Sequence, residues 1–122
     1  MNDKILNLTQ HMATPDQVKA GVHEPIHKDR IQSLLNFMEI PTEMGMRSRA
    51  EKLAYYAAED GYGKAMIGGA PYFMSHLEKA LKAKGIIPVY AFSARISTEC
   101  EQADGSVKKV IELTKLMGYF PI

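Results

Sequence analysis

The chain lacks the features that mark several large classes of protein. Its single cysteine, Cys100, excludes an internal disulfide and is typical of a reducing compartment. Neither sign of charge dominates, because 15 lysines and arginines face 14 aspartates and glutamates. Proteins that bind DNA or RNA without regard to sequence depend on a large positive excess. We therefore expect no long nucleic acid as a partner, whereas a short ligand with a few phosphates stays open.

The sequence also has no long apolar run, no internal repeat and no low-complexity tract. Its apolar stretches are far shorter than the ~18 residues that a membrane helix requires, so no membrane association is expected. The run after Met1 is too short and too soon interrupted for a signal peptide, which predicts a cytoplasmic protein. With 122 residues, the chain has the size of one domain, and we expect residues 1–122 to share one core.

The beginning of the chain predicts a buried strand followed by a short helix. Residues 5–9 form a nearly continuous apolar run, as in a strand that is covered on both faces. Thr14 can cap a helix, Pro15 fits the first helical position, and Gln17 can close a capping box. Residues 21–25 fit either a brief strand or a turn.

Two amphipathic helices are predicted next. The first ends at Ile40, because the residue before Pro41 is pushed out of the α region. The second begins at the cap Thr42 and is stopped by Gly61 and Gly63. Apolar residues at helical spacing predict the stripes that face the core: Ile31, Leu34, Leu35, Met38, Met46, Ala50, Leu53, Ala54 and Ala57.

The second half predicts a strand, a glycine loop, a helix, a strand and a hairpin. Residues 65–67 run into the loop 68–71, a helix with an apolar side follows up to Gly85, and residues 86–92 form a second apolar strand. This order demands a right-handed crossover and a parallel pair. Asp104-Gly105 indicates a two-residue hairpin turn. That turn places three pairs opposite each other: Glu101 and Lys108, Thr98 and Ile111, and Ile96 and Leu113.

Three segments that follow the predicted parallel strands are candidates for a binding site. In an open parallel sheet, ligands bind beyond the carboxyl ends of the strands, where helix N-termini and loop amides converge. This rule selects Gln10 to Thr14, Gly68 to Pro71 and Ser93 to Arg95. We predict that these loop tips meet at one edge of the sheet and form a cluster that favours anions.

Each residue of this cluster has a functional and a plainer structural interpretation. Gly68-Gly69 would let backbone amides approach a phosphate, although two glycines also make a tight turn. His11 could bind a phosphate or act as a general acid or base, or it could simply satisfy loop carbonyls. Arg95 suits bidentate phosphate binding, but strand-end arginines are often solvated. Tyr72, beside the glycine loop, could stack on a base.

Other kinds of site find less support. The glycine loop has neither the Gly-Lys-Ser/Thr ending of a Walker loop nor the third glycine of a dinucleotide fingerprint, which argues against NTPases and dehydrogenases. His23, His27 and His76 are scattered, with no pair of histidines and a carboxylate on one helix face. We therefore expect no metal site and no cofactor.

Several of these segments resemble the small CRISPR-associated ring-nuclease-like proteins, including uncharacterised phage-encoded relatives. The opening Ile5-Leu6-Asn7-Leu8-Thr9-Gln10-His11, with Thr14 and Gln17, is similar to the family's first strand and its hydroxyl and histidine residues. The similarity continues through Ile67-Gly68-Gly69-Ala70, residues 77–85, Ile87-Pro88-Val89-Tyr90-Ala91, Ser93, Arg95, Glu99 and residues 104–109. The resemblance implies a Rossmann-like (CARF-type) α/β fold, with a mostly parallel sheet flanked by helices and a C-terminal antiparallel hairpin.

The resemblance further implies a homodimer that binds a cyclic oligoadenylate across its two-fold axis and cleaves it without metal. Thr9, Gln10 and His11 would then contact the ligand from the first loop. Gly68, Gly69 and Ala70 would hold phosphate, while Ser93 and Arg95 would flank the scissile group. Catalysis would come from positioning and charge stabilisation, with His11 and Arg95 as the catalytic residues.

Two alternatives to this function stay open. The family commonly places histidine directly after the hydroxyl residue, whereas Gln10 separates Thr9 from His11 in this chain. A domain that sequesters or senses the cyclic ligand without cleaving it is therefore the first alternative. The second is a shared fold with a different ligand, such as a linear nucleotide or a protein partner.

Overall fold

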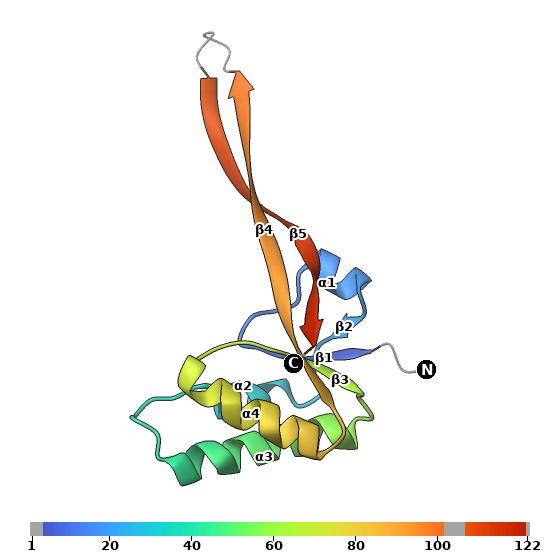
Figure 1. The fold of residues 1–122 in the computed structure, drawn as a ribbon, viewed down its shortest axis with the longest axis vertical. Coiled ribbons are helices and arrows are strands. Elements are labelled where there is room, and N and C mark those ends of the chain that lie inside the picture. The colour runs from blue at the N-terminus through green and yellow to red at the C-terminus, as the bar shows by residue number, and fades with distance from the viewer. Residues whose placement is uncertain (1–3, 102–106, 122) are drawn as a thin grey trace.

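The described residues are organised around a five-stranded sheet with the order β2-β1-β3-β4-β5 (Figure 1). The computed structural model describes the backbone of residues 4–101 and 107–121 and the side chains of residues 4–91. The elements follow the order β1 (Ile5–Leu8), α1 (Pro15–Lys19), β2 (Val22–His23), α2 (Lys28–Leu35), α3 (Glu43–Glu59), β3 (Lys64–Ile67), α4 (Pro71–Ala83), β4 (Ile87–Glu101) and β5 (Val107–Pro121).

The first four strands run parallel to one another. β1 pairs with β3 along its whole length and with β2 through Ile5 and Leu6, and β3 pairs with β4 from Lys64 to Met66. All four residues of β1 are buried, because the sheet is covered on both faces at its centre. Residues 22–23, for which the sequence left strand and turn open, form a strand. The chain is thus an α/β protein with a mostly parallel, Rossmann-like sheet flanked by helices.

Alternate residues of the central strands pack into two cores, one on each face of the sheet. On one face, Leu6, Leu8 and Ile67 pack with the apolar stripes of α2, α3 and α4. On the other face, Ile5 and Met66 join a smaller cluster with Val22, Val89 and Ala13. Figure 1 shows α2, α3 and α4 gathered on one side of the sheet, with α1 on the other.

Both predicted N-caps form. The Thr14 hydroxyl accepts a hydrogen bond from the Gln17 N–H, and the Thr14 N–H donates to the Gln17 side chain at 2.9 Å, which completes a capping box. The Thr42 hydroxyl accepts from the Gly45 N–H at 3.0 Å and starts α3. Among the described residues, no helix is long and apolar enough to cross a membrane.

The end of α2 differs from the sequence prediction. The helix stops at Leu35 rather than Ile40, and Asn36 is already extended, with φ −97° and ψ 121°. Arg49 of α3 donates hydrogen bonds to the carbonyls of Leu34 and Asn36, and so satisfies acceptors that a longer helix would have used itself. Met38 is consequently 85% exposed, so its predicted place in the core is wrong.

The strand β4 is longer than predicted. It continues through Ser93 and Arg95, where the sequence predicted a loop after Phe92. The reason is the antiparallel partner β5, which pairs with β4 from Val89 onward and supplies hydrogen bonds after β3 has ended. Register shifts around Ser93 interrupt the regular ladder at that point. Beyond them the two strands project from the rest of the molecule (Figure 1).

The register of this pair is one residue away from the predicted one. Glu101 lies opposite Val107 and Thr98 opposite Val110, rather than Lys108 and Ile111. Ile96 likewise lies opposite Glu112 instead of Leu113. The last pair joins Glu101 to Val107, so the five residues 102–106 lie between the two strands. A two-residue turn at Asp104 and Gly105 would give an even number and the predicted register. The predicted turn itself lies outside the described residues.

Candidate ligand-binding cleft

A cleft of about 360 Å³ lies at the carboxyl ends of β1 and β3, beside β4. The loop after β1 contributes residues 9–12 and Thr14, and α1 contributes Gln17. The end of β3 and its glycine loop contribute residues 66–69, and β4 contributes Tyr90 and Ala91. The structure thus brings together two of the three segments that the sequence selected. They come very close, since a Cβ added to Gly68 would lie 3.6 Å from the methyl group of Thr9.

A buried asparagine shapes the first of these loops. Asn7 of β1 is 1% exposed, and its side-chain oxygen accepts hydrogen bonds from the N–H of Thr9 at 3.0 Å and from the Thr9 hydroxyl at 2.7 Å. Its side-chain nitrogen donates to the carbonyl of His11 at 2.8 Å and to the Glu24 carboxylate at 3.0 Å. Asn7 therefore holds the loop at both ends of its first turn.

Two side chains from other elements complete this support. The Glu24 carboxylate, after β2, also accepts from the N–H of Ala13 at 2.9 Å, and Lys28 lies 3.9 Å from it. Gln32 of α2 donates to the carbonyl of Thr9 at 2.9 Å. Sequence reasoning missed these residues. The available signal was Asn7, a single amide in an otherwise apolar strand, where a buried polar group requires partners.

Some side chains of the first loop are used in its own hydrogen bonds, and others are free to contact a ligand. The Thr9 hydroxyl has one proton, and both of its acceptors, Asn7 and the carbonyl of His11, belong to the loop's own network. The side chains of Gln10 and His11 are exposed and line the cleft. Thr9 therefore shapes the site, while Gln10 and His11 are the groups that a ligand can reach.

The glycine loop presents backbone to the cleft. Gly69 has φ +146°, a conformation that residues with a Cβ rarely adopt, so glycine is needed there for its backbone and not only for space. Ala70 is the N-cap of α4 and makes no side-chain capping hydrogen bond, and Pro71 occupies the first turn. The start of this 13-residue helix thus carries partial positive charge that no side chain caps.

Tyr90 forms part of the opposite wall, and sequence reasoning did not select it as a site residue. Its hydroxyl donates a hydrogen bond of 2.8 Å to the Glu78 carboxylate of α4. Burial, and then the Glu78 hydrogen bond and negative charge, raise the pKa of Tyr90 to about 12. The phenol therefore stays protonated at any physiological pH.

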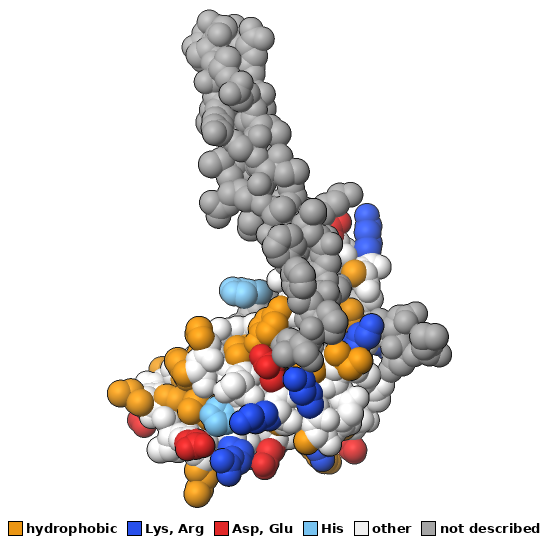
Figure 2. Space-filling model, in the orientation of Figure 1, with side chains coloured by type: hydrophobic (Ala, Val, Ile, Leu, Met, Phe, Trp, Pro, Cys, Tyr) orange, Lys and Arg blue, Asp and Glu red, His pale blue; other side chains and the backbone are white. Residues whose placement is uncertain are grey.

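The remaining predicted site residues lie elsewhere or outside the described side chains. Ala70 adjoins the glycine loop, but Tyr72 is turned away, with its ring 5.6 Å from that of Phe37. Tyr72 lines a separate hollow with the connection between α2 and α3, where Figure 2 shows hydrophobic side chains gathered. Ser93 and Arg95 belong to β4, and their side chains are not described.

Within the described part of the chain, no group of three His, Cys, Asp or Glu side chains could hold a metal ion.

Fold and cleft together define a class of protein: a Rossmann-like α/β domain with a ligand-sized cleft at the carboxyl edge of its parallel strands. The chain belongs to the family described as the uncharacterized protein MJ1673 family, whose family model matches residues 3–113. No curated protein and no solved structure matches the chain.

Proposed function

We propose that this domain binds a phosphate-bearing nucleotide in the cleft, and that the nucleotide is a cyclic oligoadenylate. The observation that carries the proposal is the meeting of the first loop and the glycine loop at one edge of the sheet. The glycine loop offers backbone amides and the uncapped start of α4, which suit a phosphate. His11 is exposed in the same cleft and can bind or protonate it. The cyclic form of the ligand rests on the resemblance to ring nucleases.

A cyclic oligoadenylate requires a homodimer in this proposal. A cleft of about 360 Å³ lies at the lower end of the range for small-ligand pockets and suits about one nucleotide. A ring of several nucleotides would need two such clefts related by a two-fold axis. The second copy would thus complete the site.

In the proposed reaction, a ribose 2′-hydroxyl of the ring attacks the neighbouring phosphorus. The 2′-hydroxyl gives up its proton as the 2′-oxygen bonds to phosphorus, the bond from phosphorus to the 5′-oxygen breaks, and the 5′-oxygen takes up a proton, which leaves a 2′,3′-cyclic phosphate and a 5′-hydroxyl. His11 is the proposed proton-transfer group, and Arg95, with Ser93 beside it, would stabilise the charge on the phosphate. This scheme needs no metal ion.

Sequestration without cleavage is the alternative, and one observation favours it. The Thr9 hydroxyl, which the resemblance placed against the ligand, is engaged with Asn7 and the carbonyl of His11. A ligand could use this hydroxyl as a donor only by displacing one of those contacts. The cleft could then hold the ring without aligning its 2′-hydroxyl for attack.

One experiment separates these possibilities. Purified protein is incubated with a panel of cyclic oligoadenylates and then heated, and the released compounds are analysed. Linear fragments support cleavage, intact rings support sequestration, and the absence of any retained or cleaved ring contradicts the proposed ligand. If cleavage occurs, His11→Ala and Arg95→Ala should each slow it by at least about tenfold.

The matched control is His76→Ala, which removes a histidine that lines the groove between α3 and α4 instead of the cleft. This variant should cleave at the wild-type rate. Unchanged rates in both the His11 and Arg95 variants would overturn the assignment of the catalytic groups. A loss of activity in the His76 variant would point to general damage to the fold.

A further inference from the structure

The two walls of the cleft have different chemistry. The loop after β1 supplies the polar side chains of Gln10 and His11, α1 supplies that of Gln17, and the glycine loop adds backbone amides. The other wall is apolar and is formed by residues 66–67 of β3 together with Tyr90 and Ala91 of β4. A ligand that fits both walls carries an anionic or polar part and a part that prefers apolar contact.

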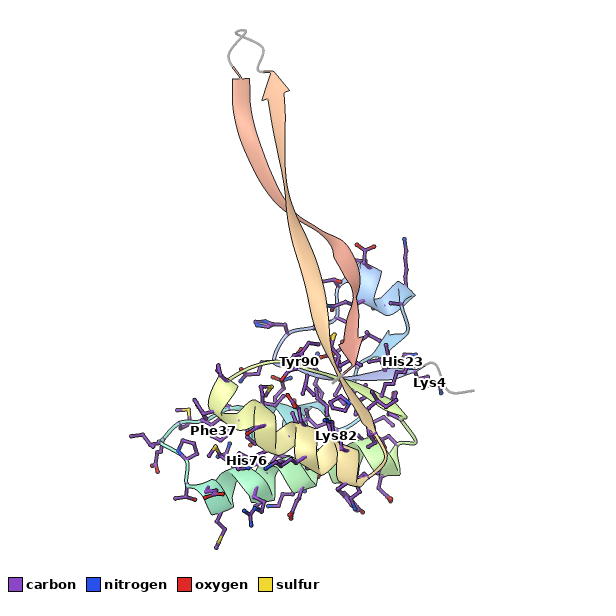
Figure 3. The ribbon with its side chains drawn as sticks, viewed as in Figure 1. Lys4, His23, Phe37, His76, Lys82 and Tyr90 are labelled. Carbon is purple, nitrogen blue, oxygen red and sulfur yellow. The ribbon has the colours of Figure 1, made fainter. Side chains whose placement is uncertain are left out.

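Tyr90 is the only Phe, Tyr or Trp among the described side chains that line this cleft. It lies where β4 passes beyond the end of β3, above α4 (Figure 3). Tyr90 is partly buried, packs against the core on the helix side and also lines the cleft. The contact of its hydroxyl with Glu78, 2.8 Å long, ties the outer end of the ring to α4.

This contact limits what Tyr90 can offer a ligand. The phenol has one proton, which it donates to Glu78, so it is not available to donate to a phosphate. Because the pKa of Tyr90 is raised to about 12, the hydroxyl is also a poor proton donor in catalysis near neutral pH. The part of Tyr90 that remains for a ligand is the ring, and an aromatic ring stacks well on a flat heterocycle.

We propose that Tyr90 is the base-binding residue of the cleft and that Glu78 is a positioning residue that holds its ring. The base of a nucleotide lies on the Tyr90 wall, and the phosphate lies at the glycine loop. This inference rests on the proposed function, because it assumes that a nucleotide occupies the cleft. It adds that the base contributes to affinity through one residue that the sequence pattern did not single out.

The test compares a probe that has a base with one that lacks it. Adenosine monophosphate and ribose 5-phosphate are titrated into the wild-type protein and into Tyr90→Leu and Tyr90→Phe by isothermal titration calorimetry. If the base stacks on the Tyr90 ring, Tyr90→Leu should lower the affinity for adenosine monophosphate by about tenfold or more. The same variant should bind ribose 5-phosphate with an affinity within about twofold of that of the wild-type protein. Tyr90→Phe keeps the ring but loses the hydrogen bond to Glu78, so it should weaken the binding of adenosine monophosphate about threefold to tenfold, less than Tyr90→Leu does.

The control variant is Tyr55→Leu, which removes an exposed tyrosine of α3 that is outside the cleft. It should leave the affinity for both probes unchanged. If Tyr90→Leu weakens both probes equally, the residue supports the fold and the base-binding role is overturned. If the wild-type protein binds both probes but does not distinguish them, this inference fails while phosphate binding stands. If it binds neither, the proposed function fails as well.

The positioning role of Glu78 needs a readout that a merely structural role would not move. Glu78→Ala removes the acceptor, whereas Glu78→Gln keeps an oxygen that can accept from Tyr90. The alanine variant should lower the affinity for adenosine monophosphate about threefold to tenfold. The glutamine variant should keep most of the wild-type affinity. Ultraviolet titration of tyrosinate should also show one tyrosine ionising at lower pH in Glu78→Ala than in wild type. Equal behaviour of the two variants in both measurements would overturn the role of Glu78.

Discussion

The side-chain nitrogen of Asn7 lies 3.0 Å from the Glu24 carboxylate, and this contact joins the buried strand β1 to the segment after β2. Asn7 is the only buried polar residue in the described core, and its amide also holds the carbonyl of His11. The same side chain thus belongs to the core at one end and to the binding loop at the other. The shape of the cleft depends on a polar residue that is itself out of a ligand's reach.

Replacing Asn7 by leucine should therefore damage both stability and binding. Leucine has a similar size, but it leaves the Thr9 N–H without its Asn7 acceptor and removes the amide donor from the Glu24 carboxylate, which keeps the Ala13 N–H. Unsatisfied groups of this kind cost about 1–3 kcal/mol, so the free energy of unfolding should fall by that amount, which urea denaturation would measure. Asn36→Leu, at an exposed position after α2, should change it by less than about 0.5 kcal/mol. Equal stabilities of the two variants would contradict the bracing role of Asn7.

Substitutions in the glycine loop should separate backbone strain from space. Gly69→Ala meets only the flexible end of Met74, 3.7 Å away, but it forces a Cβ onto a residue at φ +146°. The strain should lower the free energy of unfolding by about 1–3 kcal/mol, again by urea denaturation. Gly68 has no positive φ, and a Cβ there would lie 3.6 Å from the Thr9 methyl group, an ordinary van der Waals contact. Gly68→Ala should therefore lower the free energy of unfolding by less than about 1 kcal/mol. A larger loss for Gly68→Ala than for Gly69→Ala would refute this explanation.

Arg49 should be required for the exposed connection between α2 and α3. Its guanidinium donates a hydrogen bond of 2.7 Å to the carbonyl of Asn36 and lies 4.4 Å from the ring centre of Phe37. Arg49→Met keeps the apolar stem but loses both contacts, and it should cost about 1–2 kcal/mol and speed limited proteolysis in residues 36–41. Arg47→Met, which breaks only an exposed ion pair with Glu43, is the control and should change neither quantity appreciably.

Tyr90 should make stability depend on pH in the alkaline range. Its pKa is about 12 in the folded protein against 10.0 for an ordinary tyrosine, so the unfolded chain loses this proton first as pH rises. The stabilisation is complete below pH 10.0 and is lost between pH 10.0 and about 12. Urea denaturation of wild type and Tyr90→Phe across this range should show their difference constant below pH 10.0 and falling above it. A difference that does not change with pH would contradict the raised pKa.

Much of the fold follows from signals that are local in the sequence. Thr14 and Thr42 cap helices because each hydroxyl needs only an N–H three residues further on. The apolar stripe of α3 and the continuous apolar run of β1 are likewise readable, since helices and buried strands have fixed periods. The closeness of the first loop and the glycine loop could be predicted too, because parallel strands bring their carboxyl ends to one edge.

The sequence by itself thus determined most of the helices and strands, and it predicted three segments at one edge of the sheet, of which the first loop and the glycine loop line the cleft. Only the tertiary structure decided that α2 ends early against Arg49, that β4 continues beside β5, and that Tyr90 is tied to Glu78. The side-chain contacts among them join distant residues: Arg49 and Leu34 are 15 residues apart and Tyr90 and Glu78 are 12 apart, as Asn7 and Glu24 of the loop support are 17 apart. Local propensity and periodicity report on neighbours within a turn or two, so long-range partners become visible only when packing has placed them together.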